Sequence, residues 1–352
     1  MKNNIIITNL YKYYNNIVIY NMNDNIPWVD KYRPHHIESL VHQDEVKKVL
    51  LNTLKTGNLP NFIFYGPPGT GKTSAILALA YQLFGPKLIS ERVLELNASD
   101  ERKINVVREK IIKFAKESIS NPDPDYPSPP YKIIILDEAD AITLDAQSAL
   151  RKVIESASRI TRFCFTCNYI EKIIQPIISR CVKFRFKPLS LDLLSERLAK
   201  IAILENIKIN KDCVERISEI SGGDGRKAIM ILQNCKYIKK EKNQLITIED
   251  CDEITGITNN KILKEIYDKL IQSNIYELND LVTEIINNGT NLNNLLKYIK
   301  DIIIKTNIID SNKSKIITEI LNIECKLMEK ADEFLQILYL FSLISLIMTN
   351  KM

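Results

Sequence analysis

The sequence predicts a parallel α/β core followed by α-helical segments, on three observations. A loop rich in glycine and proline at 66–73 separates a short apolar run from a helical pattern. A second apolar run, at 132–136, ends in carboxylates, and the last third of the chain contains little glycine or proline. Continuous apolar runs are typical of parallel strands buried on both faces, and long runs without helix breakers are typical of helices. The 352 residues are enough for two or three domains.

The loop at 66–73 is a complete G-x-x-x-x-G-K-T phosphate-binding motif. The run Phe62–Tyr65 before it is expected to be a strand and Ser74–Ala80 after it a helix, which is the context that this motif requires. Glycines let backbone amides curl around a β-phosphate, and the helix N-terminus adds positive potential. The sequence therefore predicts a nucleoside triphosphate site. Its expected loop residues are Gly66, Pro67, Pro68, Gly69, Thr70, Gly71, Lys72 and Thr73.

The acidic end of the second apolar run is expected to complete this site, because α/β sheets bind ligands at the carboxyl ends of their strands. From the loop, Lys72 is expected to reach the β- and γ-phosphates and Thr73 to bind Mg²⁺. Asp137 is expected to join the Mg²⁺ shell as the Walker-B acid, and Glu138 to orient and polarise an attacking water. Together the two motifs predict hydrolysis.

Composition narrows the class of protein. The formal charge of +5 is a mild excess that allows a local nucleic-acid face. The seven cysteines are scattered and odd in number, which favours a reducing compartment over a disulfide framework. No apolar run approaches the roughly 20 residues of a transmembrane helix, and the N-terminus lacks the pattern of a secretion signal. Residues 1–25, rich in Asn, Ile and Tyr, are expected to be a disordered arm.

Two other classes of enzyme are excluded because the sequence lacks residues that they need. Asp137–Asp140 spells the signature of the DEAD-box helicases, which also need a downstream histidine, but His35, His36 and His42 all precede Lys72. An ATP-driven metalloprotease needs a His-Glu-x-x-His zinc site, and the sequence has none.

Cys164 and Cys167 form a C-x-x-C with no second pair at zinc-finger spacing. They fall in the apolar run Phe163–Cys167, which is expected to be a strand. Residues three apart in a straight strand point to opposite faces, so we expect two separately buried thiols rather than a shared metal site.

Residues 102–119 show the pattern of an amphipathic helix with a basic face. Its apolar positions at helical spacing are Ile104, Val107, Ile111, Phe114 and Ala115. The opposite face carries Arg102, Lys110, Lys113 and Lys116, diluted by Glu109 and Glu117. By itself this pattern is typical of an ordinary solvated face. The proline-rich stretch 121–130 cannot continue the helix and is expected to be a loop.

Beyond these motifs, the sequence resembles the AAA+ clamp loaders, and within them the small subunits of eukaryotic replication factor C. The match is nearly continuous from Trp28 to Leu189 and looser from there to the C-terminus. The further segments that carry it are Trp28–Pro34, Glu95–Arg102, Ala149–Lys152, Cys167–Tyr169, Ser179–Cys181, Lys183–Leu189 and Gly223–Ile229. Leu83–Pro86 and the proline-rich loop favour the subunit type called second in yeast and fourth in human.

The resemblance implies roles that the motifs alone do not assign. Asn168 matches the sensor-1 position, which helps to hold the attacking water or the γ-phosphate. Arg226 matches sensor 2, which reaches the γ-phosphate from a helical lid. Arg180 matches the arginine finger, a catalytic residue that acts in trans in the ATP site of the neighbouring subunit. The residues implied to lie near the adenine or ribose are Val29, Arg33 and Val41.

The resemblance also implies contacts with DNA and with a sliding clamp. In the family, the helix corresponding to 102–119 tracks the DNA backbone, which implies DNA binding by Arg102, Lys103, Lys110 and Lys113. The segment around Leu83–Arg92 is expected to face the clamp. Two residues depart from the family pattern. Lys103 stands where a glycine is usual, and Gly225 stands where a larger apolar residue is usual and is expected to loosen the start of the lid helix.

Four regions are expected: a disordered arm at 1–25, an AAA+ ATPase core at 26–188, a helical lid at 189–256 and a helical collar at 257–352. The helical patterns Leu295–Ile304 and Phe334–Ile347 in the last region could equally form a self-contained bundle. The resemblance favours contacts between subunits.

The function implied is that of an ATPase subunit of a hetero-pentameric clamp loader in the nucleus, with ATP and Mg²⁺ as cofactors. Its implied partners are the other replication factor C subunits, the sliding clamp PCNA and primer–template DNA, during replication and repair. Two alternatives stay open. One is a ring scaffold that does not hydrolyse ATP, against which the intact Lys72, Asp137, Glu138 and Asn168 argue. The other is a homo-hexameric AAA+ remodeller, which the subunit composition of the assembly would decide.

Overall fold

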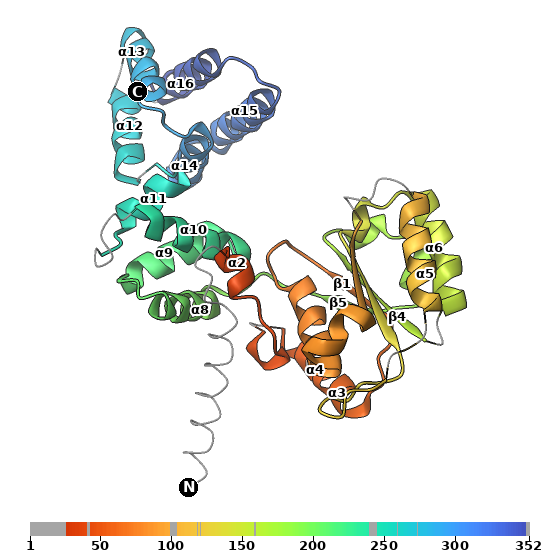
Figure 1. Cartoon of the computed structure of the whole chain (residues 1–352). Helices are drawn as coiled ribbons and strands as arrows, with labels where there is room; N and C mark the ends of the chain where they lie inside the picture. Colours follow the sequence, from red (N-terminus) through yellow and green to blue (C-terminus); the bar gives the residue numbers. More distant parts are fainter. Residues whose placement is uncertain are drawn as a thin grey trace. The chain divides into compact units, whose positions relative to one another are not determined.

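The computed structural model describes residues 26–40, 43–98, 104–117, 119, 121–157, 160–238, 245–258, 260–272 and 274–349. The chain forms two compact units, divided between Ile246 and Thr247 and named here the first unit and the second unit (Figure 1). The expected arm at 1–25 lies outside the described residues.

A parallel sheet of five strands lies at the centre of the described part of the first unit. The strands are β1 (Phe62–Tyr65), β2 (Val93–Asn97), β3 (Lys132–Asp137), β4 (Thr161–Cys167) and β5 (Val182–Arg185), in the order β2-β3-β4-β1-β5. All four neighbouring pairs run parallel. The carboxyl ends of the strands therefore meet at one edge, and the strands expected around 62–65, 132–136 and 163–167 are confirmed.

Alternation along the strands divides the core of the first unit into two layers. Phe62 and Phe64 pack with α3 (Asp44–Thr56) and α4 (Lys72–Arg92). Ile63 packs in the other layer with α5 (Ile104–Lys116) and α6 (Leu144–Ala157). Figure 1 shows the two pairs of helices on opposite sides of the sheet. The sequence folds this way because side chains in a strand alternate between its two faces, and both faces are apolar.

The C-x-x-C residues lie in different layers. Cys164 belongs to the layer of α3 and α4, and Cys167 to the layer of α5 and α6. Both thiols are buried, and burial raises the pKa of each, to about 12 for Cys167. The prediction of two separately buried strand residues is confirmed.

The α4 helix runs on to Arg92 through a kink at Gly85, which has a φ of +70° and precedes Pro86. A side chain cannot fit at Gly85, because an added Cβ would lie 2.4 Å from the ring of Tyr126. Tyr126 belongs to the stretch 121–130, which forms neither helix nor strand, as expected. The segment Leu83–Arg92, predicted to follow the first helix, is thus its kinked continuation.

The α5 helix falls within the expected range 102–119 and has the expected orientation where it is described. Ile111 and Ala115 are buried in the core, and Lys110 and Lys113 are exposed.

In the described part of the first unit, β5 is followed by α8 (Leu191–Leu204), α9 (Lys211–Ser221) and α10 (Gly225–Ile238). The short helix α2 (Trp28–Lys31), from the start of the described chain, packs against α10 (Figure 1). The predicted lid region continues to 256, but α11 (Ile248–Thr255) belongs to the second unit.

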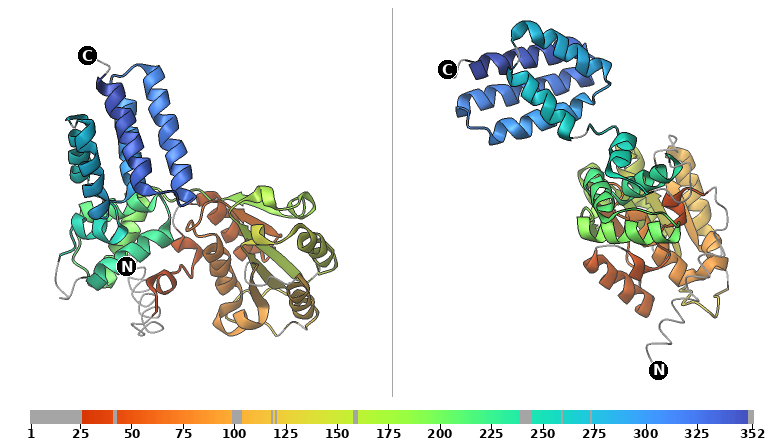
Figure 2. Two further views of the ribbon diagram at one scale, coloured as in Figure 1. Left: turned by 90° about the horizontal axis from the view of Figure 1, so that it is seen from above. Right: turned by 90° about the vertical axis from the view of Figure 1, so that its left-hand side faces the viewer.

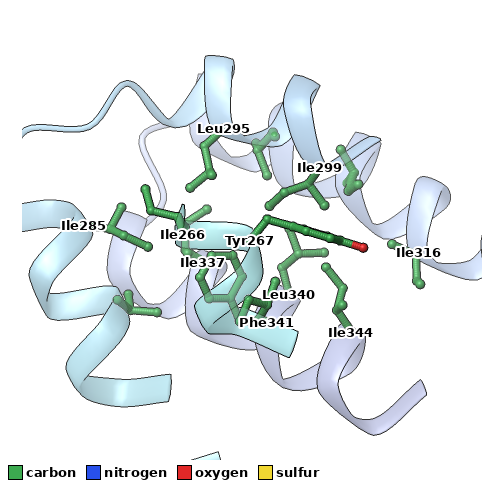
Figure 3. Packing of buried hydrophobic residues seen from close by; sticks show 14 of the residues in the cluster. Ile266, Tyr267, Ile285, Leu295, Ile299, Ile316, Ile337, Leu340, Phe341 and Ile344 are labelled. Carbon is green, nitrogen blue, oxygen red and sulfur yellow. The ribbon is translucent and has the colours of Figure 1, made fainter. Parts of the chain in front are cut away.

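In the described residues of the second unit, all regular structure is helical. After α11 come α12 (Asn260–Gln272), α13 (Ile275–Asn287), α14 (Leu292–Lys305), α15 (Asp310–Met328) and α16 (Glu333–Thr349), several of them side by side (Figure 2). Its core is built mainly from leucine and isoleucine, and Figure 3 shows Tyr267, Ile299 and Phe341 within it. The helices expected at 295–304 and 334–347 are confirmed. Across the described residues, no helix is both long and apolar enough to cross a membrane.

Candidate nucleotide-binding site

The predicted phosphate-binding and acidic motifs meet at the carboxyl edge of the sheet. The loop 66–71 follows β1, Asp137 ends β3 and Asn168 follows β4, so three neighbouring strands deliver them to one place. A pocket opens there. It is lined by Val29, Tyr32, Arg33, Pro34, Leu40, Gln43, Pro68, Gly69, Thr70, Gly71, Lys72, Thr73, Ser74, Asp137, Glu138, Asn168, Phe186, Leu189, Leu194, Arg197, Gly225, Arg226 and Ile229.

Glycine is required at two points of the phosphate loop. Gly66 has a φ of +138°, and an added Cβ would lie 2.2 Å from the carbonyl oxygen of Phe186. Gly69 has a φ of +67°, and an added Cβ would lie 1.7 Å from Oδ1 of Asp224. L-residues with side chains rarely adopt such backbone conformations, and here the space is also filled. The loop is therefore packed against two later segments of the first unit.

Lys72 begins α4 and turns its ammonium back over the loop. Its Nζ donates hydrogen bonds to the carbonyl oxygens of Gly66 and Pro67, both at 2.8 Å, and to Oδ1 of Asn168 at 3.0 Å. Burial lowers the pKa of Lys72, and the carboxylates of Asp137 and Asp140 offset part of this effect. The three acceptors are neutral oxygens, so anionic phosphate oxygens at this point would be stronger partners for the ammonium.

Asp137 is fixed by three donors. Its Oδ2 accepts from Oγ1 of Thr73 at 3.0 Å, and its Oδ1 accepts from Oγ1 of Thr166 and from the amide of Glu138 at 3.1 Å. A hydroxyl beside a carboxylate supplies the hard oxygen donors that Mg²⁺ prefers, so the side chains of Thr73 and Asp137 fit the predicted metal.

Glu138 is exposed and has a left-handed backbone, with φ +53° and ψ +41°. This conformation is uncommon for a residue with a side chain, and such strain often occurs at functional sites. The turn at Glu138 lets the chain leave the strand directly after Asp137, so that both carboxylates stay at the pocket.

Asp140 holds the predicted sensor residue in place. Its Oδ2 accepts hydrogen bonds from the backbone amides of Asn168 at 3.3 Å and Tyr169 at 3.2 Å. No motif in the sequence assigns a role to Asp140. Its position after the Walker-B strand was a signal that it lay nearby, but the contact joins residues 28 positions apart, which no local pattern shows.

The start of α10 contacts the phosphate loop. The amide of Gly225 donates to the carbonyl oxygen of Gly69 at 3.1 Å, and Oδ1 of Asp224 accepts from the amides of Arg226 at 2.8 Å and Lys227 at 3.0 Å. Asp224 thus caps the helix that carries Arg226 to the pocket. An added Cβ at Gly225 would lie 3.0 Å from Cδ1 of Leu189 and 3.2 Å from the oxygen of Gly69, so this departure from the family pattern allows a close approach.

The far wall of the pocket comes from the start of the described chain and from the helices after β5. Val29 and Arg33, which the resemblance implies, line it together with Tyr32, and so do Gln43 and Arg197, which it missed. Gln43 is buried and exchanges hydrogen bonds with the backbone of Lys187, donating from Nε2 at 2.9 Å. These residues are brought together by tertiary structure alone, and no sequence signal links them.

Arg180 does not line this pocket. Its guanidinium lies on the surface of the first unit, where Nη2 pairs with Oε1 of Glu155 at 2.6 Å and Nη1 donates to the carbonyl oxygen of Pro176 at 2.7 Å. Nε of Arg151 also pairs with Oε1 of Glu155, at 3.1 Å. Of the other predicted site residues, Val41, Arg102 and Lys103 lie outside the described residues.

Comparison with known proteins gives the family. Residues 62–189 match the ATPase family associated with various cellular activities (AAA), and residues 258–342 match the replication factor C C-terminal domain. Replication factor C subunit 2 of Schizosaccharomyces pombe is 43% identical over 324 residues, which cover 92% of this chain and 95% of the relative. The chain belongs to the replication factor C subunit family. This replication factor C subunit is an ATPase, as its AAA region and its relatives show.

Human replication factor C subunit 4 is 43% identical over 316 residues, or 90% of this chain and 86% of the relative. The predicted likeness to the subunit type called second in yeast and fourth in human is therefore confirmed. The RuvB Holliday junction branch migration motor of Thermotoga maritima superposes on the replication factor C subunit with a TM-score of 0.51 and 18% identity, over 72% of this chain and 85% of that one. This likeness supports the predicted AAA+ fold.

Proposed function

We propose that this replication factor C subunit binds ATP with Mg²⁺ in the pocket and hydrolyses it within a hetero-pentameric clamp loader. The loader would open the sliding clamp PCNA and place it on primer–template DNA in the nucleus, during replication and repair. The observation that carries the proposal is the direct contact between the residues of the phosphate-binding motif and the residues at the ends of β3 and β4. Lys72 contacts Asn168 and Thr73 contacts Asp137, in a chain whose AAA region and C-terminal region both match the family.

Each side chain at the pocket has a role that follows from its chemistry. Lys72 binds the β- and γ-phosphates, and Glu138 orients and polarises the attacking water. Asn168, held by Asp140 through its amide, fixes the water or the γ-phosphate. Arg226 adds positive charge from the start of α10. Thr73 and Asp137 would hold Mg²⁺, which neutralises charge on the phosphates.

Arg180 supplies the arginine finger of a neighbouring subunit's site. It lies on the surface away from its own pocket, and a guanidinium presents a permanent planar charge to phosphate oxygens. Arginine fingers accelerate hydrolysis by roughly 10³–10⁵. Hydrolysis would therefore depend on two adjacent subunits.

The remaining partners would be contacted by other parts of the chain. Lys110 and Lys113, exposed on α5, would contact DNA phosphates together with Arg102 and Lys103. The kinked segment Leu83–Arg92 would face the clamp, and residues 257–352 would act as the collar between subunits. Residues 26–188 and the helices up to 256 would serve as ATPase core and lid.

ATPase activity of the assembled complex, stimulated by clamp and DNA, tests the proposal. We expect Lys72→Ala to abolish ATP binding at this subunit's site, and Arg180→Ala to leave that binding intact while slowing hydrolysis at the neighbour's site. Loss of ATP binding in the Arg180→Ala subunit itself would contradict the assignment in trans. Purification as a homo-hexamer instead of a five-subunit complex would contradict the clamp-loader assignment.

A further inference from the structure

The buried carboxylate of Glu205 connects the helices after β5 to the start of the described chain. Its Oε1 accepts from Nζ of Lys31 and from the hydroxyl of Tyr32, both at 2.5 Å, and its Oε2 accepts from Nζ of Lys236 at 2.8 Å. Lys31 and Tyr32 lie more than 170 positions before Glu205 in the sequence. One side chain therefore joins three segments of the first unit.

The helix end and burial disfavour a negative charge on Glu205, whereas its hydrogen-bond donors favour it. Glu205 follows the last residue of α8, and a helix C-terminus disfavours a negative charge. Burial alone would raise the pKa of Glu205, but hydrogen bonds from Lys236, Lys31 and Tyr32 hold that pKa below its ordinary value. The carboxylate is therefore kept charged, and removing it would leave two ammonium groups without their shared acceptor.

The segment held by Glu205 forms part of the pocket wall. Trp28 is buried, its amide donates to Oε1 of Gln233 at 3.1 Å, and Nζ of Lys236 lies 5.0 Å from its ring centroid. The next residues, Val29, Tyr32 and Arg33, line the pocket, as do Leu194 and Arg197 of α8 and Ile229 of α10.

The same segment is anchored to the α/β core a few residues later. Ile37 and Leu40 are buried in the layer of α3 and α4, and the amide of Ile37 donates to Oε1 of Gln82 at 3.0 Å. Residues 28–40 thus cross from α10 past the pocket to α4. The position of the wall depends on both attachments, and Glu205 provides the main ionic contact at one of them.

We propose that Glu205 is a positioning residue for nucleotide binding, which fixes the Val29–Pro34 wall against α8 and α10 without touching the nucleotide. This inference rests on the proposal that Val29 and Arg33 flank the adenosine part of ATP. Phosphate binding by Lys72 and hydrolysis by Glu138 depend on other elements. The effect of losing Glu205 should therefore fall on affinity and on selection of the base, with little effect on the rate at saturation.

The test compares Glu205→Gln with Glu215→Gln in the full chain and in the assembled complex. Glu215 is an exposed acid of the first unit, paired with Lys211 at 3.3 Å, and gives a charge-matched control. We expect Glu205→Gln to raise the Kd for ATP about tenfold and to reduce the preference for ATP over GTP. At saturating ATP its kcat should stay within about twofold of the wild type, which a general loss of structure would not allow. Lys31→Arg, which keeps the donor, should retain most of the affinity, and Lys31→Met should not.

Several results would overturn the inference. An unchanged Kd and base preference in Glu205→Gln would show that the wall does not need the carboxylate. A fall in kcat as large as the rise in KM, with a lowered melting temperature, would show a purely structural role. Val29→Asp tests the proposed adenosine wall separately from the role of Glu205. If it weakens ATP binding and Glu205→Gln does not, only the inference on Glu205 fails. If neither matters while Lys72→Ala abolishes binding, the proposed adenosine wall fails.

Discussion

Replacing Gly69 by alanine tests how the phosphate loop and α10 depend on each other. The added Cβ would lie 1.7 Å from Oδ1 of Asp224, so the aspartate must move. That oxygen accepts from the amides of Arg226 and Lys227 and so caps α10. The substitution therefore forces a side chain into a left-handed backbone, with φ +67°, and also removes a helix cap.

The two costs can be separated. Gly57 has the same φ of +67°, but nothing lies within 4 Å of an added Cβ, so Gly57→Ala measures the backbone cost alone. We expect about 1 kcal/mol for that strain and about 1 kcal/mol for the lost cap. Gly57→Ala should thus lower the free energy of unfolding of the first unit by about 1 kcal/mol, and Gly69→Ala by about 2 kcal/mol.

Urea unfolding followed by the fluorescence of Trp28 measures both losses. Trp28 is the single tryptophan in the sequence, and it packs against α10. Asp224→Ala should cost about 1 kcal/mol by removing the cap, and the double variant should lose no more than Gly69→Ala because the collision is gone. A double variant that loses the sum of the single effects, about 3 kcal/mol, would exclude the collision between residue 69 and Asp224, and so would a Gly69→Ala variant as stable as Gly57→Ala.

Three further predictions concern the pocket and α5. Glu138→Gln should retain ATP binding and lower hydrolysis by at least about a hundredfold, measured by phosphate release; a normal rate would exclude Glu138 from activating the water. Asp140→Ala should lower kcat about tenfold with an unchanged Kd for ATP, because the amides of Asn168 and Tyr169 lose their acceptor. Replacing the nearby exposed Glu171 by alanine should change neither kcat nor Kd. Lys110→Ala and Lys113→Ala should each reduce the slope of log K for DNA against log salt by about 1, and an unchanged slope would place α5 away from the DNA. Lys211→Ala, an exposed lysine on α9, is the control for that slope.

The carboxyl edge of the sheet was predictable because its residues end or directly follow recognisable strands. Gly66, Asp137 and Asn168 come after apolar runs, and parallel strands bring their ends to one edge whatever their order. The opposite directions of Cys164 and Cys167 were also predictable, because side chains alternate between the two faces of a strand.

The other side of the pocket was not predictable from residues alone. Gln43 pairs with the backbone of Lys187, and Tyr32 with Glu205, across separations of 144 and 173 positions. Such contacts depend on the tertiary packing of segments far apart in the chain, which a single sequence does not show. Gly225 illustrates the same limit. Helix propensity suggests that it loosens α10, whereas its amide bonds to Gly69 and its small size permits that contact.

Arg180, the proposed arginine finger, is already paired at the surface of its own chain. Its guanidinium is held by Glu155 and the carbonyl oxygen of Pro176, so the side chain is already ordered at the surface. An exposed ion pair contributes little net stability, because water and salt compete for both charges. The guanidinium can therefore exchange Glu155 for a phosphate at small cost, and less rotamer entropy is lost than from a free side chain. Glu155 keeps Arg151 as a partner when Arg180 leaves, so the exchange does not leave the Glu155 carboxylate unpaired.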